Sequence, residues 1–144
     1  QPVRELSKII SGGELSRFML ALKNTISNLD NIETMVFDEI DTGIGGRTAQ
    51  MVAERIAMVA AHRQVLCITH LPQIACMADT HLYISKHVID NQTSTVIHPL
   101  TTGERVNEIA RMASGANVSS ASLDNAREMI AYAGVKKEEY KKNG

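Results

Sequence analysis

The stretch "TMVFDE", residues 34 to 39, decides the fold class of this chain. Its first four residues form a short apolar run, the pattern of a strand buried on both faces of a parallel sheet. A second run of this kind, "VLCIT", spans residues 65 to 69. Strand, helix and strand with short joints predict a βαβ unit. The helix between the runs carries one apolar face, made of Ala49, Val52, Ala53, Ile56, Val59 and Ala60.

Another helix is expected upstream, over residues 14 to 28, and it ends within residues 28 to 31. Ser11 followed by Glu14 is a capping box that begins it. Six apolar residues recur at helical spacing, and we expect them to face the core. They are Leu15, Phe18, Met19, Leu22, Ile26 and Leu29.

The second half of the chain predicts a short helical turn after Leu71 and Pro72, followed by a hairpin and two helices. The segments "HLYISKHV" and "STVIHPL" flank residues 90 to 93 as two antiparallel strands. Helices are expected over residues 102 to 113 and 121 to 133. Thr101 with Glu104 forms a second capping box, Gly115 and Gly134 occupy C-terminal cap positions, and "KKEEYKKNG" is a solvated end.

Composition predicts one soluble α/β domain over residues 1–144, of which 44% are hydrophobic. The net charge of -1 excludes an overall electrostatic footprint for nucleic acid or membrane. Cys67 and Cys76 lack metal or redox spacing, so reduced thiols of a cytosolic protein are expected. No apolar run is long enough for a membrane span, and the start does not resemble a signal peptide. The start also lacks an initiator Met and is patterned from its first residues, which suggests a piece of a longer chain.

Two adjacent carboxylates, Asp38 and Glu39, follow the first strand at the sheet edge where α/β folds place ligands. Like charges side by side favour a cation or a hydrogen-bond network, so Mg²⁺ at Asp38 and a water activated by Glu39 are expected. The alternative is two solvated acids that begin a loop. His70 follows the second strand at the same edge, where an imidazole is either structural or a donor to a phosphoryl oxygen.

Gly12 and Gly13 begin the first helix. Residues without side chains at a helix start allow a phosphate to approach the backbone amides and the positive end of the helix dipole. The alternative is that this segment is no more than a helix cap.

The segments "SGGELSR", "MVFDE" and "CITH" resemble, in this order, the signature motif, the Walker B strand and the switch-histidine segment of ABC-type ATPases. More narrowly, "SGGELSRFMLALK", "FDEIDTGIGGRTAQ" and "LCITHLPQIACMAD" resemble the RecN family of bacterial DNA double-strand-break repair proteins, relatives of the structural-maintenance-of-chromosomes (SMC) proteins. The similarity runs from Leu6 to Met129. It implies the C-terminal half of an ABC-type P-loop ATPase head, with a short parallel sheet, a hairpin and C-terminal helices.

The resemblance also implies roles for these residues. ATP lies between two heads, so Ser11, Gly12, Gly13 and Glu14 would bind in trans the γ-phosphate of ATP held by the other head. Asp38 would hold Mg²⁺ through water, Glu39 would activate the attacking water, and His70 would contact the γ-phosphate. Arg17 is either a link between nucleotide closure and the rest of the head or an exposed helix arginine.

Two departures from the family pattern limit the resemblance. Gly45 stands where related heads carry an Asp, while Asp41 comes earlier. No Walker A motif, G-x-x-x-x-G-K-[ST], occurs, so we expect this fragment to be inactive alone. In related heads the Walker A strand lies between the switch-histidine strand and the strand at residues 82–86. Its loss predicts self-association or a rearranged hairpin.

The expected partners are a second head, an N-terminal half with the Walker A motif and a coiled coil, and DNA through the complete protein, with no membrane. The expected location is the bacterial cytoplasm, at the nucleoid during repair. Three alternatives remain: a chromosome-tethering SMC-type ATPase, a transporter nucleotide-binding domain and an interaction module with degenerate motifs. An SMC-type ATPase is expected to carry an Ala-rich loop where this chain has "TGIGG". A transporter domain is expected to carry Gln at the position of Glu14 and Pro at the position of Ile40, so the residues present disfavour it.

Overall fold

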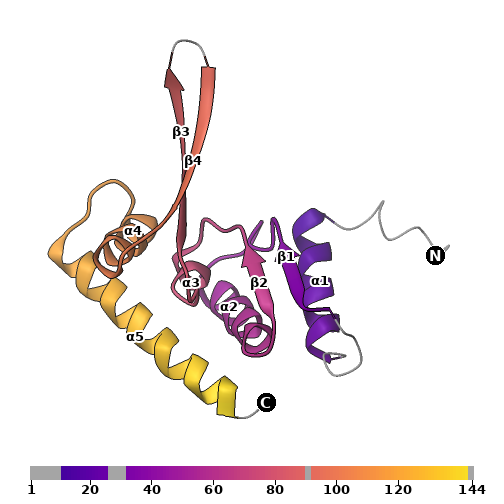
Figure 1. Ribbon diagram of the computed structural model, residues 1–144. Coiled ribbons are helices and arrows are strands. Elements are labelled where there is room, and N and C mark those ends of the chain that lie inside the picture. Colours follow the sequence, from indigo (N-terminus) through magenta and orange to yellow (C-terminus); the bar gives the residue numbers. More distant parts are fainter. Residues whose placement is uncertain (1–10, 26–31, 90–91, 143–144) are drawn as a thin grey trace.

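The computed structural model describes residues 11–25, 32–89 and 92–142 (Figure 1). Its elements confirm the mixed α/β class, with a short parallel sheet, a hairpin and surrounding helices. In chain order they are α1 (Gly12–Thr25), β1 (Thr34–Phe37), α2 (Gly46–Ala60), β2 (Gln64–Cys67), α3 (Pro72–Ala75), β3 (Leu82–Ile89), β4 (Gln92–Pro99), α4 (Thr102–Ser114) and α5 (Ser120–Lys142).

The predicted βαβ unit is confirmed. Strands β1 and β2 are parallel, with Thr34 opposite Gln64 and Phe37 opposite Cys67, and α2 connects them. Strand β2 ends at Cys67, before the expected end at residue 69, because its partner β1 ends at Phe37, opposite Cys67. Both strands finish at one edge of the sheet, which brings the segments that follow them together.

The expectation that these strands are buried on both faces is wrong. Met35 and Phe37 are buried, but Val36 between them is 65% exposed. Leu66 and Ile68 are exposed as well. Alternate side chains of a strand point to opposite faces, so within the described residues the core covers one face of the β1–β2 sheet and leaves an apolar face open.

The expected core face of α1 is also wrong. Leu15, Phe18, Met19 and Leu22 are exposed, whereas Gly13 and Leu20 are buried. Helix α1 packs through a stripe that includes Arg17 and Asn24, whose side chains donate to backbone carbonyls of neighbouring segments. Helical periodicity thus identified residues that share a face but not the face that packs. The expected positions of Ile26, Leu29 and the helix end at 28–31 lie outside the described residues.

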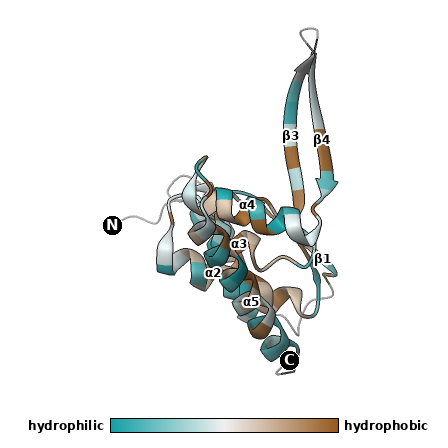
Figure 2. Ribbon diagram, turned by 90° about the vertical axis from the view of Figure 1, so that its left-hand side faces the viewer, coloured by the Kyte–Doolittle hydropathy of each residue, from teal (hydrophilic) through white to brown (hydrophobic). Residues whose placement is uncertain are grey.

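The predicted hairpin is confirmed. Strands β3 and β4 pair antiparallel, with Leu82 opposite Pro99 and Ile89 opposite Gln92. In the described part of the chain they form a sheet separate from β1–β2, and they extend away from the helices (Figure 1). Hydrophobic and hydrophilic bands both occur along the hairpin (Figure 2), where Leu82, Ile84 and Ile97 are exposed.

Helix α4 begins as the sequence predicts. Thr101 Oγ1 accepts from the amide of Glu104, whose carboxylate in turn accepts from the amide of Thr101 at 2.8 Å. Gly115 ends the helix with φ 77°, and its amide donates to the carbonyl of Arg111 at 2.8 Å. A positive φ is the conformation in which glycine is favoured.

The expected helix end at Gly134 is wrong, because α5 continues through it to Lys142. A glycine inside a helix costs about 1 kcal/mol relative to alanine, which favourable contacts beyond it can offset. Lys137 Nζ lies 2.9 Å from Asp79 Oδ1, and Tyr140 packs partly buried against the core. Residues 136–142 of the segment expected to be a solvated end therefore form the last turns of a packed helix, and the remaining two lie outside the described residues.

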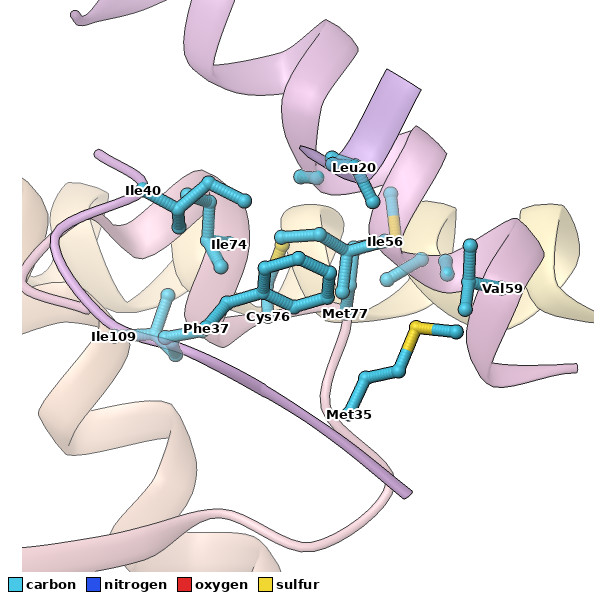
Figure 3. Packing of buried hydrophobic residues seen from close by; sticks show 14 of the residues in the cluster. Leu20, Met35, Phe37, Ile40, Ile56, Val59, Ile74, Cys76, Met77 and Ile109 are labelled. Atoms are coloured by element: carbon cyan, nitrogen blue, oxygen red, sulfur yellow. The ribbon is translucent and has the colours of Figure 1, made fainter. Parts of the chain in front are cut away.

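The core joins α1, β1, the segment after it, and α2 to α5 (Figure 3). Phe37, Ile40 and Ile109 lie within it, and Ile40 is fully buried directly after the acid pair. Cys67 and Cys76 are free thiols, as expected. Burial raises the pKa of Cys67 to about 12 and that of Cys76 to about 11, so both thiols stay protonated near neutral pH.

Candidate functional site

The site predicted from the sequence lies at the carboxyl ends of β1 and β2. Asp38 and Glu39 directly follow β1, and both are exposed. His70 comes three residues after β2, and the amide of Ile68 donates to the carbonyl of Phe37 at 3.0 Å to hold the strand ends together. Helix α1 begins beside them. The structure therefore brings all three predicted segments to one edge.

The segment from Asp38 to Thr42, here called the acid loop, is tightly turned. Asp38 Oδ1 accepts from the amide of Glu39 at 2.9 Å, and the amide of Thr42 donates to the carbonyl of Glu39 at 3.0 Å. Glu39 has φ 56°, the left-handed region that costs a residue with a side chain about 1–2 kcal/mol. Such strain is found preferentially at functional sites, where the surrounding structure maintains it.

Polar side chains of α1 hold the acid loop in place. Ser16 Oγ donates to the carbonyl of Asp38 at 2.8 Å. Arg17 Nη1 donates to the carbonyls of Ile40 at 3.1 Å and Thr42 at 2.9 Å. Of the two roles considered for Arg17, the exposed helix arginine is excluded, since its guanidinium connects the helix to the loop.

The two glycines make this contact possible. A Cβ at Gly12 would collide with Glu39 Oε2. A Cβ at Gly13 would lie 2.7 Å from the carbonyl oxygen of Glu39 and 3.0 Å from Thr42 Cβ. The glycines therefore let α1 approach the acid loop of the same chain, a function that neither the phosphate hypothesis nor the helix cap includes.

The predicted capping box at the start of α1 is confirmed. Glu14 Oε2 accepts from the amide of Ser11 at 3.0 Å and from its hydroxyl at 3.1 Å, while the amide of Glu14 donates to Ser11 Oγ at 3.4 Å. These hydrogen bonds, led by the one from the Ser11 amide, lower the pKa of Glu14. The glutamate thus stays ionised at neutral pH.

Asp41 is the residue of the site to which sequence reasoning gave no role. It is only 3% exposed, and its Oδ2 accepts from Thr69 Oγ1 at 2.6 Å and from the amide of His70 at 2.8 Å. His70 Nδ1 also lies 3.0 Å from this oxygen. The available signal was a third acid close behind the Asp38–Glu39 pair, opposite a strand end that carries Thr and His.

Two opposing effects set the pKa of Asp41. Burial raises it, but the hydrogen bonds from Thr69 and the His70 amide, together with the charge of His70, outweigh burial and leave the pKa below its ordinary value of 3.8. The carboxylate is therefore charged at neutral pH although it is buried. Its charge is stabilised chiefly by Thr69 and His70, in the segment that follows β2.

Replacing Asp41 by Asn is expected to lower the free energy of unfolding at about pH 7 by ~1–2 kcal/mol, because the lost hydrogen bonds end on a charged acceptor. A lowered folded-state pKa stabilises above the unfolded value of about 3.8, and this stabilisation disappears as the pH falls through the folded pKa. Urea unfolding of both proteins at several pH values measures the difference. A difference that stays constant below about pH 3 would contradict this assignment.

The acid loop fits a magnesium ion that is held chiefly by other ligands. Asp38 presents one exposed carboxylate, and Mg²⁺ in nucleotide sites uses one or two carboxylates besides waters and phosphate oxygens. Over residues 11–25, 32–89 and 92–142, no group of three or more His, Cys, Asp or Glu side chains could hold a metal ion. Asp38 is thus suited to a Mg²⁺ ion that takes most of its ligands from outside this loop.

Comparison with known proteins finds similarity to the DNA repair protein RecN of several bacteria. The chain is 50% identical to the DNA repair protein RecN of Bacillus subtilis over 133 residues, and 48% identical to that of Treponema pallidum over 130. These matches cover 92% and 90% of this chain. The chain is similar to the C-terminal part of RecN.

The similarity covers only a part of each RecN protein. The chain spans 23% of the length of these RecN proteins. RecN of Xylella fastidiosa is 50% identical over 130 residues, again 23% of that protein. No protein-family profile matches the chain. Within the described residues, no helix is long and apolar enough to cross a membrane.

Proposed function

We propose that this chain is the C-terminal part of an ATP-binding and ATP-hydrolysing head of a RecN-type DNA repair protein. The observation that carries the proposal is the gathering of a glycine-containing helix start, an exposed acid pair and a histidine at one sheet edge. The similarity to RecN proteins supports DNA repair as the biological process.

Three residues at this edge, Asp38, Glu39 and His70, have different roles in ATP hydrolysis. Glu39 orients and deprotonates the attacking water, and Asp38 holds Mg²⁺ through water. His70 donates to the γ-phosphate, where charge develops in the transition state. Mg²⁺, when bound, neutralises charge on the phosphate oxygens. All three side chains are exposed at the edge and accessible to a nucleotide.

A second head completes the site. Ser11, Gly12, Gly13 and Glu14 bind the γ-phosphate of ATP held by that other head, through the first amides of α1. In a two-fold symmetric pair, one surface meets its own copy. Since the helix start and the acid loop share one edge, each chain offers both halves of the site across such an interface.

An N-terminal half completes each head by supplying the Walker A motif and the coiled coil. The open face of the β1–β2 sheet and the exposed side chains of α1 are its docking surface, and its strand joins the two separate sheets. DNA is a partner of the complete protein, which works in the bacterial cytoplasm, at the nucleoid. Without this half, the chain self-associates through its open apolar faces.

ATP hydrolysis measured with purified components tests the proposal. This chain alone is expected to be inactive, whereas the complete gene product, or the chain mixed with its Walker A half, hydrolyses ATP with and without DNA. A rate that changes when DNA is added separates this proposal from a transporter nucleotide-binding domain, for which no response to DNA is expected. A complete gene product that neither binds nor hydrolyses ATP would overturn the proposal.

A further inference from the structure

We infer that Asp41 is a positioning residue that holds the His70 ring with a protonated Nδ1 directed inward and Nε2 presented outward. The inference concerns a contact within this chain. Its consequence for ATP hydrolysis rests on the function proposed above. Asp41 acts through His70 and does not itself touch the nucleotide.

The contrast in exposure between the two side chains supports this assignment. The Asp41 side chain is 4% exposed, and that of His70 is 73% exposed. The Nδ1 atom lies 3.0 Å from Asp41 Oδ2, so the Nδ1 edge of the ring lies against a buried carboxylate. The two ring nitrogens lie on different edges of the imidazole, and Nε2 consequently faces away from the carboxylate.

The charge on Asp41 determines which nitrogen carries the proton. A lone pair on Nδ1, 3.0 Å from an ionised oxygen, would be repelled, whereas an N–H at that position is attracted. A neutral histidine side chain in water prefers the proton on Nε2, so Asp41 reverses this preference. The outward Nε2 then accepts a hydrogen bond when His70 is neutral and donates one to a phosphoryl oxygen when the ring is cationic.

Asp41 is itself held rigidly, as a positioning residue must be. The same Oδ2 accepts from Thr69 Oγ1 and from the His70 amide, and Thr69 Oγ1 in turn accepts from the amide of Leu71 at 3.0 Å. Ile40, next to Asp41, is fully buried in the core. These contacts also stabilise the turn after β2, so a test has to separate positioning of the ring from stability of the turn.

Nitrogen-15 NMR of the His70 ring in this chain tests the inference without any variant. The expected spectrum of the neutral form has its proton on Nδ1. A proton on Nε2 overturns the inference. Asp41→Asn is expected to return the ring to the Nε2–H form, while the matched control Asp124→Asn, at an exposed carboxylate of α5, leaves the spectrum unchanged.

A double-mutant cycle in the complete gene product tests the consequence for catalysis. Asp41→Asn is expected to lower kcat for ATP about tenfold or more, with KM changed less than about twofold. In a His70→Ala background the same substitution is expected to change kcat less than about twofold. An equal loss in both backgrounds means that Asp41 acts on stability alone and overturns the inference.

The two tests also distinguish this inference from the proposed function. If the wild-type gene product hydrolyses no ATP, the proposed function fails, and the ring spectra alone decide whether Asp41 fixes His70. If hydrolysis is present but the neutral ring carries its proton on Nε2, the proposed function stands and the inference fails.

Discussion

Replacing Glu39 by Gln is expected to slow ATP hydrolysis by the complete gene product about 10²- to 10⁴-fold, the range that a positioned general base contributes. Glutamine keeps the size and the exposed position of the side chain but cannot take a proton from water. ATP binding is expected to persist, so the variant accumulates as an ATP-bound pair of heads. Single-turnover hydrolysis and size-exclusion chromatography with ATP measure the two effects.

A matched control separates the chemistry at Glu39 from a general loss of charge. Glu128→Gln makes the same change at an exposed glutamate of α5 and is expected to leave hydrolysis unchanged. Thermal unfolding of both variants should match the wild type, because both side chains are exposed. Full activity of Glu39→Gln would remove Glu39 from the role of general base.

Gly13→Ala is expected to lower the free energy of unfolding by about 1–3 kcal/mol, the usual cost of overpacking. The added Cβ would lie 2.7 Å from the backbone carbonyl oxygen of Glu39, and this atom cannot move without shifting the acid loop. Urea unfolding of the variant measures the loss. Gly12→Ala is expected to cost less, since the conflicting atom there is the end of the flexible Glu39 side chain.

The chain contains a close control for this substitution. Gly103 lies two residues after the N-cap Thr101 of α4, as Gly13 does after Ser11 in α1, and both helices begin with a capping box. A Cβ at Gly103 would meet nothing within 4 Å. Gly103→Ala is therefore expected to be neutral or to stabilise by up to about 1 kcal/mol. Equal losses at both positions would show that the helix start, and not the acid loop, requires glycine.

Local sequence signals predicted the elements correctly wherever the signal itself is local. The capping box of Thr101 and Glu104 and the left-handed Gly115 depend on neighbouring residues alone. The apolar strands around residues 34–37 and 64–67, separated by one helix, allow few pairings other than a parallel pair. The gathering of Asp38, Glu39 and His70 at one edge follows from that pairing.

The failures concern partners that lie far away in the sequence. The apolar periodicity of α1 favoured the helix face that carries Phe18. The face that packs is instead the one with Ser16 and Arg17, because their side chains donate hydrogen bonds to three backbone carbonyls of the acid loop. Gly134 was predicted to end a helix, but the helix continues, and Lys137 beyond it forms a salt bridge with Asp79, a residue far away in the sequence. The role of Asp41 depends on Thr69 and His70, which follow β2 and lie beside Asp41 only in the folded chain.

The uncovered apolar face of the β1–β2 sheet has a thermodynamic consequence. Heat capacity rises on unfolding in proportion to the apolar surface that becomes hydrated, at about 12–15 cal/mol/K per residue in an ordinary globular domain. In a single folded copy that has not self-associated, Val36, Leu66 and Ile68 are already hydrated, so they add little to that rise. The dependence of stability on temperature is accordingly flatter for this chain than for a domain of equal length whose sheet is covered on both sides.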